Sequence, residues 1–369
     1  MRATVEPQAP RPLPLLRSPH FFGGFEPRGD GVADAAIEDH SATAAPPRAD
    51  GAAAAAAIQS AAARVRENVQ RVVVGADQAV DLLLVALLNR GHVLLEDVPG
   101  TGKTTTARAL AKSIGASFHR IQFTPDLMPS DVVGINFYSQ KSGEFEYRPG
   151  PLVANIVLAD EINRATPRTQ SSLLEAMEER TITVDGVTKP LPDPFVVLAT
   201  QNPVELEGTF PLPEAQLDRF FVRMKLGYPS ESDELAIVHR FEDSSPLDDL
   251  EPVIDGAELS ALGAQLSAIH VDDSVARYAV QICRATRRHE AFDLGASPRA
   301  SLALFRAARG WAAIQGRDYV RPDDVKELSH PVLAHRLVLN SNTRLRGRAT
   351  DEVLDEVVAD VAVPIADQR

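Results

Sequence analysis

Cysteine is nearly absent from this sequence of 369 residues, and long apolar runs are absent altogether. Cys283 is the only cysteine, so an intramolecular disulfide and a cluster of thiolate metal ligands are both excluded. No apolar run approaches the ~20 residues that span a bilayer, and the segment 12–16 is too short and too rich in proline for a secretory signal. We therefore expect a cytoplasmic protein without membrane insertion.

Several catalytic and binding signatures are also missing. The nine histidines show no metal-ligand spacing, and the sequence contains neither a Gly-x-Ser-x-Gly nor a His-Glu-x-x-His motif. The formal net charge of −13 opposes attraction to nucleic-acid phosphates. These absences argue against a zinc hydrolase, a serine hydrolase and a nucleic-acid partner.

The composition predicts a folded chain with an atypical start. Hydrophobic residues make up 44% and charged residues 24%, which is ordinary globular usage. Residues 1–60 contain eight prolines before Arg48 and an alanine run at 52–57, so we expect a disordered tail there. A helical pattern over 61–88, interrupted at 72–75, is expected to begin the folded part.

Short apolar strands then alternate with amphipathic helices, a pattern typical of a parallel sheet covered by helices. The predicted strands are 93–96, 118–123, 156–160, 195–200 and 222–226, the last of them a half-exposed edge strand. Asp185-Gly186 predicts a tight turn between strands 181–184 and 187–189. We predict an α/β core over 61–228.

The strand signals fade after Pro229, and residues 229–369 are expected to form a small helical lid domain with a C-terminal helix. Ser230 and Asp233 resemble a capping box, which predicts a helix that continues through Leu235, Val238 and Phe241.

The segment 93–104 reads as a strand, a glycine turn and the start of a helix. The helix over 104–114 carries a buried stripe, so its free N–H groups and its dipole would face a bound triphosphate. Lys103 would reach the β- and γ-phosphates, the Thr104 hydroxyl would bind Mg²⁺, and Gly100 and Gly102 would let the backbone wrap the anion. A surface turn is the alternative. Asp97 departs from the general pattern, which has glycine there.

Two later strands end in polar residues suited to the same site. Asp160 and Glu161 close one strand, where Asp160 would hold Mg²⁺ and Glu161 would act as the general base on the attacking water. Asn202 follows the next strand and could orient that water. Taken alone, the acidic pair could be a surface feature and Asn202-Pro203 a simple turn.

Together these residues resemble an AAA+ ATPase, and the fuller match is to the MoxR family. Similarity spans about residues 60–345. It is carried by residues 95–104, 160–165, 173–179 and, most distinctively, by 208–220, which reads Gly-Thr-Phe-Pro-Leu-Pro-Glu-Ala-Gln-Leu-Asp-Arg-Phe. MoxR-like sequences often have Asp-Val-Pro in the phosphate loop, as here at 97–99.

The resemblance implies further site residues. Asn202 would be the first sensor, Arg219 an arginine finger offered to the adjacent subunit, and Arg299 the second sensor, placed by the predicted helix start Ser297-Pro298-Arg299 over the γ-phosphate. The alternative for Arg219 is an ordinary exposed arginine. Nucleotide contacts are implied for Val74, Gly75, Pro99, Gly100, Thr101, Gly102, Lys103, Thr104 and Thr105.

The leading hypothesis is therefore Mg²⁺-dependent ATP hydrolysis in a ring, expected to be a hexamer, that remodels or matures a protein client. By resemblance, that client could bear a von Willebrand factor A domain, and cofactor insertion is one candidate task. Two alternatives are a nucleotide-dependent binding switch without significant turnover and a motor subunit similar to those of metal chelatases. A nucleic-acid motor is disfavoured by the net charge.

Overall fold

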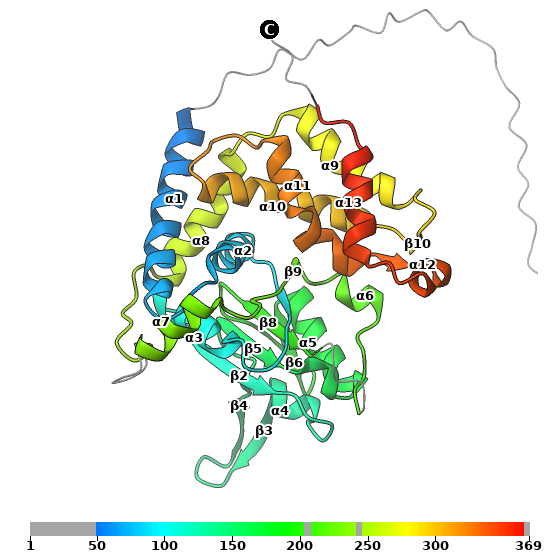
Figure 1. Ribbon diagram of the computed structural model, residues 1–369. Coiled ribbons are helices and arrows are strands. Elements are labelled where there is room, and N and C mark those ends of the chain that lie inside the picture. The colour runs from blue at the N-terminus through cyan, green and yellow to red at the C-terminus, as the bar shows by residue number, and fades with distance from the viewer. Residues whose placement is uncertain (1–48, 203–207, 241–245, 365–369) are drawn as a thin grey trace, which may run out of the picture. The chain divides into compact units, whose positions relative to one another are not determined.

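The computed structural model describes residues 49–202, 208–240 and 246–364. A parallel sheet of five strands lies at its centre, in the order β2-β5-β8-β1-β9, with helices on both faces (Figure 1). The strands are β1 (Val93–Glu96), β2 (Phe118–Gln122), β5 (Ile156–Asp160), β8 (Val196–Gln201) and β9 (Val222–Met224). The predicted fold class is confirmed, and β9 lies at one edge of the sheet as expected.

Side chains of the central strands alternate between two hydrophobic clusters, because successive residues of a strand point to opposite faces. Leu94, Val157 and Val197 belong to the cluster that includes α5. Val93 and Leu158 belong to the other cluster, which contains α1–α3 and also helices of the C-terminal half. The sheet is thus buried on both faces, as is usual for parallel sheets.

The helices precede, separate and follow these strands. They are α1 (Ala49–Gln70), α2 (Asp77–Leu88), α3 (Lys103–Ser113), α4 (Pro129–Val133), α5 (Pro167–Glu179), α6 (Glu214–Leu217), α7 (Glu231–Arg240), α8 (Gly256–Gln265), α9 (Asp273–Thr286), α10 (Pro298–Ile314), α11 (Pro322–Leu333), α12 (Ser341–Leu345) and α13 (Thr350–Asp360). No helix in these described ranges is long and apolar enough to cross a membrane.

Helix α1 corrects one boundary of the sequence analysis. It begins at Ala49, inside the stretch 1–60 that was predicted to be a disordered tail, so the prediction is wrong for residues 49–60. Ala54, Ala55 and Ile58 are buried there, and α1 contacts α3, α8 and α10. The alanines pack closely because their side chains are small. Residues 1–48 lie outside the described part of the chain.

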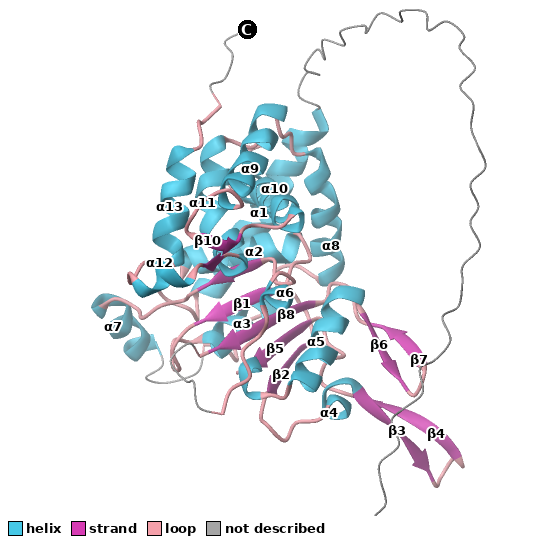
Figure 2. Ribbon diagram, turned by 90° about the vertical axis from the view of Figure 1, so that its right-hand side faces the viewer, coloured by secondary structure: helices cyan, strands magenta, loops and turns pink. Residues whose placement is uncertain are grey.

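Two hairpins project beside each other from one end of the sheet (Figure 2). The predicted one consists of β6 (Thr181–Val184) and β7 (Val187–Pro190), and Asp185 and Gly186 both have positive φ, as a tight two-residue turn requires. The other, β3 (Gly134–Ser139) with β4 (Glu144–Pro149), was not predicted. The side chain of Asn136 donates a hydrogen bond of 2.8 Å to Asp185 and joins the hairpins.

The region after β9 is mainly helical, with one small sheet of β10 (Phe292–Leu294) and β11 (Val338–Leu339). The predicted cap of α7 is present, because Ser230 Oγ accepts from the Asp233 N–H at 3.2 Å and the Asp233 carboxylate accepts from the Ser230 N–H. Leu235 and Val238 of this helix are exposed. Phe241 lies outside the described residues.

Candidate functional site

The loop between β1 and α3 has the form of a phosphate cradle. Gly100 and Gly102 have φ of +88° and +84°, a region that favours glycine, and no atom lies within 4 Å of where a Cβ would stand on either residue. Helix α3 begins at Lys103, so its free N–H groups face the loop. Lys103 Nζ donates to the carbonyl oxygens of Val98, at 2.7 Å, and Asp97, at 3.2 Å.

The two acidic residues after β5 are held by a buried hydroxyl on β8. Thr200 Oγ1 donates to Asp160 Oδ1 at 2.6 Å and accepts from the Glu161 N–H at 2.8 Å. Glu161 has a φ of +56°, which is uncommon for a residue with a side chain. This hydroxyl therefore helps to fix the turn that presents both carboxylates.

Two side chains of β2, which lies beside β5, contact the same carboxylates. Arg120 donates to Asp160 Oδ2 from Nε at 3.0 Å and from Nη2 at 2.6 Å. Gln122 donates to Glu161 Oε2 at 2.8 Å, and Arg164 Nε lies 3.0 Å from the same oxygen. Sequence reasoning missed Arg120, Gln122 and Thr200, because no motif marks them and their role depends on strand order.

These elements enclose one cavity of about 410 Å³. The phosphate loop forms one side of it, and the ends of the three neighbouring strands form the other. Of the residues proposed from the sequence, it is lined by Pro99, Gly100, Gly102, Lys103, Thr104, Thr105, Asp160, Glu161 and Asn202. The structure thus brings together residues that lie up to about a hundred positions apart in the chain.

A second cavity of about 340 Å³ adjoins the first, since Gly100, Gly102 and Thr105 line both. Its walls are largely apolar and come from residues 72–76, the start of α3, and the segment that leads from β9 to α7. Val74, Gly75 and Thr101, which were proposed as nucleotide contacts, all line it. An apolar pocket next to a phosphate loop suits a flat nucleobase.

Arg219 and Arg299 lie in a different cavity, of about 200 Å³. Both bind the carboxylate of Glu178, with Arg219 Nη2 at 3.1 Å from Oε2 and Arg299 Nη1 at 3.3 Å from Oε1. Neither arginine lines the cavity that contains Lys103. The structure therefore brings the two arginines to each other and does not bring Arg299 to the phosphate loop of its own chain.

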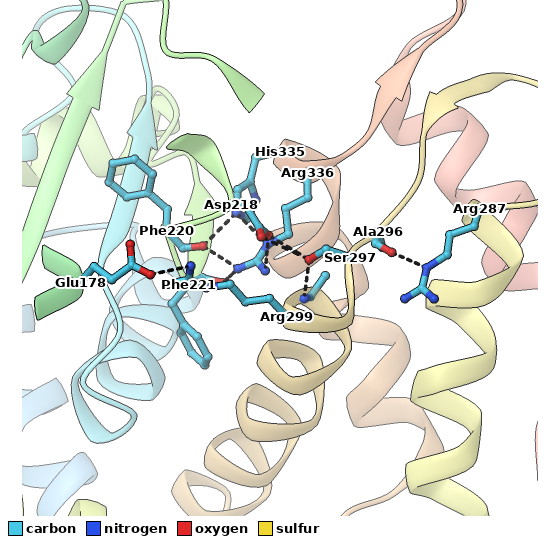
Figure 3. Close-up of polar contacts among 11 residues, drawn as sticks. Glu178, Asp218, Phe220, Phe221, Arg287, Ala296, Ser297, Arg299, His335 and Arg336 are labelled. Atoms are coloured by element: carbon cyan, nitrogen blue, oxygen red, sulfur yellow. Dashed lines mark hydrogen bonds and ion pairs between the residues drawn. The ribbon is translucent and has the colours of Figure 1, made fainter. Parts of the chain in front are cut away.

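A buried ion pair lies between Asp218, which precedes Arg219 in the chain, and Arg336; Figure 3 shows it beside Ser297 and Arg299. Arg336, whose side chain is 3% exposed, lies 2.9 Å from Asp218 and also donates to the Phe220 carbonyl at 2.6 Å. Burial lowers the pKa of Arg336 to about 10, and it therefore stays charged at neutral pH. Asp218 also accepts from Ser297 Oγ, which caps α10 just before Arg299. The loop carrying Arg219 and the start of α10 are thereby joined.

The cavity around these arginines is rich in positive charge. Six arginines line it, against the two carboxylates of Glu178 and Asp218: Arg90, Arg180, Arg219, Arg299, Arg306 and Arg336. The pKa values of Arg180 and Arg306 are lowered, chiefly by burial. Such a surplus of guanidinium groups suits a phosphate-bearing ligand.

Comparison with known proteins gives consistent matches. Residues 92–222 match the model described as "ATPase family associated with various cellular activities (AAA)", and residues 284–366 match the "AAA lid domain" model. The YeaC protein of Bacillus subtilis is 53% identical, over 81% of this chain and 93% of that protein. The protein named Chaperone MoxR1 of Mycobacterium tuberculosis is 42% identical, over 94% of this chain and 92% of that one.

A solved structure shares the architecture as well. A Cytophaga hutchinsonii protein described as a candidate ATPase superimposes with a TM-score of 0.80 at 36% identity. The match covers 85% of this chain and 98% of that one. The two structures therefore share their overall architecture over most of both chains.

Proposed function

Because this chain belongs to the MoxR family of AAA+ ATPases, we propose that it hydrolyses ATP with Mg²⁺ in a ring and uses the energy to remodel a protein client. One observation carries the catalytic part. The phosphate loop with Lys103, the acidic pair Asp160 and Glu161, and Asn202 line one cavity that continues into an apolar pocket. The smaller pocket has the size and lining for adenine and the larger one the donors for a triphosphate.

Lys103, Glu161 and Asn202, which line the larger cavity, each have a separate proposed role in ATP hydrolysis. Lys103 would leave the Val98 carbonyl, which it now contacts at 2.7 Å, and bind the β- and γ-phosphates. Glu161 would accept the proton of the attacking water, and Asn202 would orient that water. Each residue directly follows one of two neighbouring strands, β5 and β8, and both line the same cavity, so they can act on one water molecule.

A magnesium ion fits the oxygen donors Thr104 and Asp160, which line the same cavity. When bound, it would neutralise charge on the β- and γ-phosphates. Asp160 Oδ2 is bound to Arg120 at 2.6 Å, so Arg120 must yield this oxygen or share it. No group of three or more His, Cys, Asp or Glu suited to a metal occurs in the described residues, and we expect the phosphates and water to complete the shell.

Arg219 and Arg299 motivate the ring. Both lie in the positively charged cavity and neither lines the cavity of its own phosphate loop, which favours a role towards a nucleotide held by another subunit. Arginine supplied in trans stabilises the charge that develops on a transferred phosphoryl group. We propose that the two arginines act together on the γ-phosphate held by the neighbouring subunit, in a ring expected to be a hexamer.

The client is proposed from the relatives. The Mycobacterium tuberculosis relative is named a chaperone, which supports remodelling or maturation of a protein in this case too. A partner with a von Willebrand factor A domain, cofactor insertion as the task and a cytoplasmic location remain parts of the proposal. The alternatives of a chelatase-like motor and of a binding switch share the same nucleotide site.

Substitution of Glu161 by glutamine tests hydrolysis against the switch. Glu161→Gln removes the base but keeps the shape of the side chain, so ATP binding should persist while phosphate release falls about 10²–10⁴-fold. Glu175→Gln, at an exposed glutamate of α5, is the matched control and should retain parental turnover. Equal phosphate release by Glu161→Gln and the parent would refute the role of the base, and negligible turnover by the parent would favour the switch.

A further inference from the structure

Asp97, the residue of the phosphate loop that departs from the general motif, is buried, and its carboxylate accepts hydrogen bonds from backbone N–H groups. It is 7% exposed. Its Oδ1 accepts from the N–H of Val98 at 3.0 Å, and its Oδ2 accepts from the N–H groups of Leu226 and Gly227 at 2.8 and 2.9 Å. A buried carboxylate with several N–H donors is well satisfied without a cation.

These contacts join the phosphate loop to the segment that follows the edge strand. The backbone pairing of β1 with β9 ends at Leu95 and Met224, and the Asp97 side chain continues the connection beyond that point. Gly227 has a φ of +74°, which lets two successive N–H groups point at one oxygen. We name residues 226–229 the connector, because they lead from β9 into α7.

The connector is also one wall of the apolar pocket. Leu226, Gly227 and Pro229 line it, together with Ile237 of α7, opposite the segment 72–76. Helix α7 packs against that segment and the end of α1. A Cβ on Gly75 would lie 2.6 Å from Asp233 Oδ2, and Arg240 donates to the carbonyl of Gln70, the last residue of α1, at 2.6 Å. The position of the connector therefore helps to set the width of the pocket.

Asp97 also contacts the phosphate-binding lysine through its main chain. Its carbonyl oxygen accepts from Lys103 Nζ at 3.2 Å, a contact that Lys103 must give up in order to bind a triphosphate. The same residue is thus bound to the lysine of one cavity and to the wall of the other. Within the described residues, the hydrogen bonds between the connector and the phosphate loop are those that Asp97 accepts from Leu226 and Gly227.

We propose that Asp97 is a positioning residue that links the phosphate loop to the connector, so that the pocket for the base is formed only while the two are joined. The proposal rests on the proposed function in taking a nucleotide as the ligand. It contradicts the simplest expectation from the motif, which is that glycine at position 97 would be neutral or beneficial.

The test compares the binding of ATP with that of inorganic tripolyphosphate, each with Mg²⁺, by titration calorimetry on the full chain. Tripolyphosphate needs only the larger cavity, whereas ATP needs both cavities. For Asp97→Gly we expect the Kd of ATP to rise about tenfold, and that of tripolyphosphate to change by less than about threefold. Asp97→Asn should give a smaller change of the same kind, because its amide keeps one acceptor oxygen.

Control variants separate this role from general stabilisation. Asp272 caps α9 by accepting from the Ser274 N–H at 2.8 Å and lines neither cavity, so Asp272→Gly removes a comparable hydrogen bond outside the site and should leave both Kd values unchanged. Gly227→Ala perturbs the connector from its own side, since the added Cβ meets no atom within 4 Å but disfavours the φ of +74°. Gly347→Ala, with the same φ and the same open space, is its control.

The outcomes are decisive. The proposal predicts that Gly227→Ala also weakens the binding of ATP but not that of tripolyphosphate. The double variant with Asp97→Gly should bind ATP no more weakly than Asp97→Gly alone, because both substitutions break the same link. Parental ATP binding by Asp97→Gly would overturn it, and so would equal losses for ATP and tripolyphosphate. These readouts need no turnover, so a parent chain that binds ATP but does not hydrolyse it would refute the proposed function and leave this inference standing.

Discussion

At the scale of single residues, the single hydroxyl of Thr200 contacts both of the acidic residues that are proposed to act in ATP hydrolysis. Its side chain is buried, and one oxygen atom contacts Asp160 at 2.6 Å and the Glu161 backbone at 2.8 Å. A buried N–H that loses its acceptor costs about 1–3 kcal/mol. The geometry of both acids therefore depends on a hydroxyl that takes no part in the reaction itself.

Replacing this hydroxyl should impair turnover more than binding. For Thr200→Val we expect kcat for ATP hydrolysis to fall about tenfold or more, with a smaller change in KM, because a turn that shifts by fractions of an ångström misplaces the base. Thr200→Ser keeps the hydroxyl and should retain most of kcat. Steady-state phosphate release measures both constants; identical values for the valine and serine variants would contradict this role.

From the sequence, we could predict that residues lie in one site only where those residues belong to a recognisable motif. Lys103, Asp160 and Asn202 each follow a recognisable strand, and the carboxyl ends of parallel strands share one edge of a sheet. Arg120 could not be found this way, because its contact with Asp160 requires β2 to lie beside β5, which the sequence does not encode locally. Arg299 was expected over the γ-phosphate, and its position beside Arg219, where both arginines contact Glu178, could not be foreseen from the sequence.

At the scale of elements, the five strands of the central sheet were predicted well, whereas the start of α1 and the β3–β4 hairpin were not. Apolar residues that end at a polar one mark a buried strand clearly, and the fold class followed. The alanine run of α1 gave no such signal, because alanine is common in disordered segments and in helices alike. The β3–β4 hairpin was missed for another reason: a Cβ on Gly134 would lie 2.4 Å from the Arg148 carbonyl oxygen, a constraint visible only in three dimensions.

Truncating a buried side chain tests whether residues 49–60 are part of the folded core. Ile58 is 1% exposed within the main hydrophobic cluster, so Ile58→Ala should lower the free energy of unfolding by about 2–5 kcal/mol. Ser60→Ala, at an exposed position of the same helix, should change it by less than about 0.5 kcal/mol. Urea denaturation measures both. Equal stability of the two variants would indicate that this end of α1 is dispensable.

At the scale of the whole molecule, one buried histidine makes stability depend on pH. His92 Nε2 lies 2.9 Å from the Met177 carbonyl and its Nδ1 accepts from the Val197 N–H at 3.0 Å, so only the neutral ring fits both partners. Burial lowers the pKa of His92 from 6.5 to about 4. In the unfolded chain the ring gains its proton below pH 6.5, whereas in the folded chain it does so only near pH 4.

Stability should therefore fall as the pH drops from about 6.5 towards 4, because the unfolded state binds more protons in that window. The loss from this group is on the order of 2 kcal/mol between pH 7 and pH 5. In His92→Gln this contribution disappears, so the difference in unfolding free energy between the two pH values should shrink. Urea denaturation at pH 7 and pH 5 measures this difference for both proteins. If the difference were the same in His92→Gln and in the parent, its assignment to His92 would be contradicted.

In the proposed ring, each site is complete only when two neighbouring subunits contribute residues to it. Lys103→Ala removes the phosphate contact within a subunit, and Arg219→Ala removes the charge offered to its neighbour, so each variant alone should be nearly inactive. In a mixed ring, an Arg219→Ala subunit still has Lys103, and a neighbouring Lys103→Ala subunit still has Arg219, so the site between them is intact. We predict that phosphate release reappears on mixing the two purified variants. A mixture as inactive as its components, or full activity of Arg219→Ala alone, would contradict a shared site.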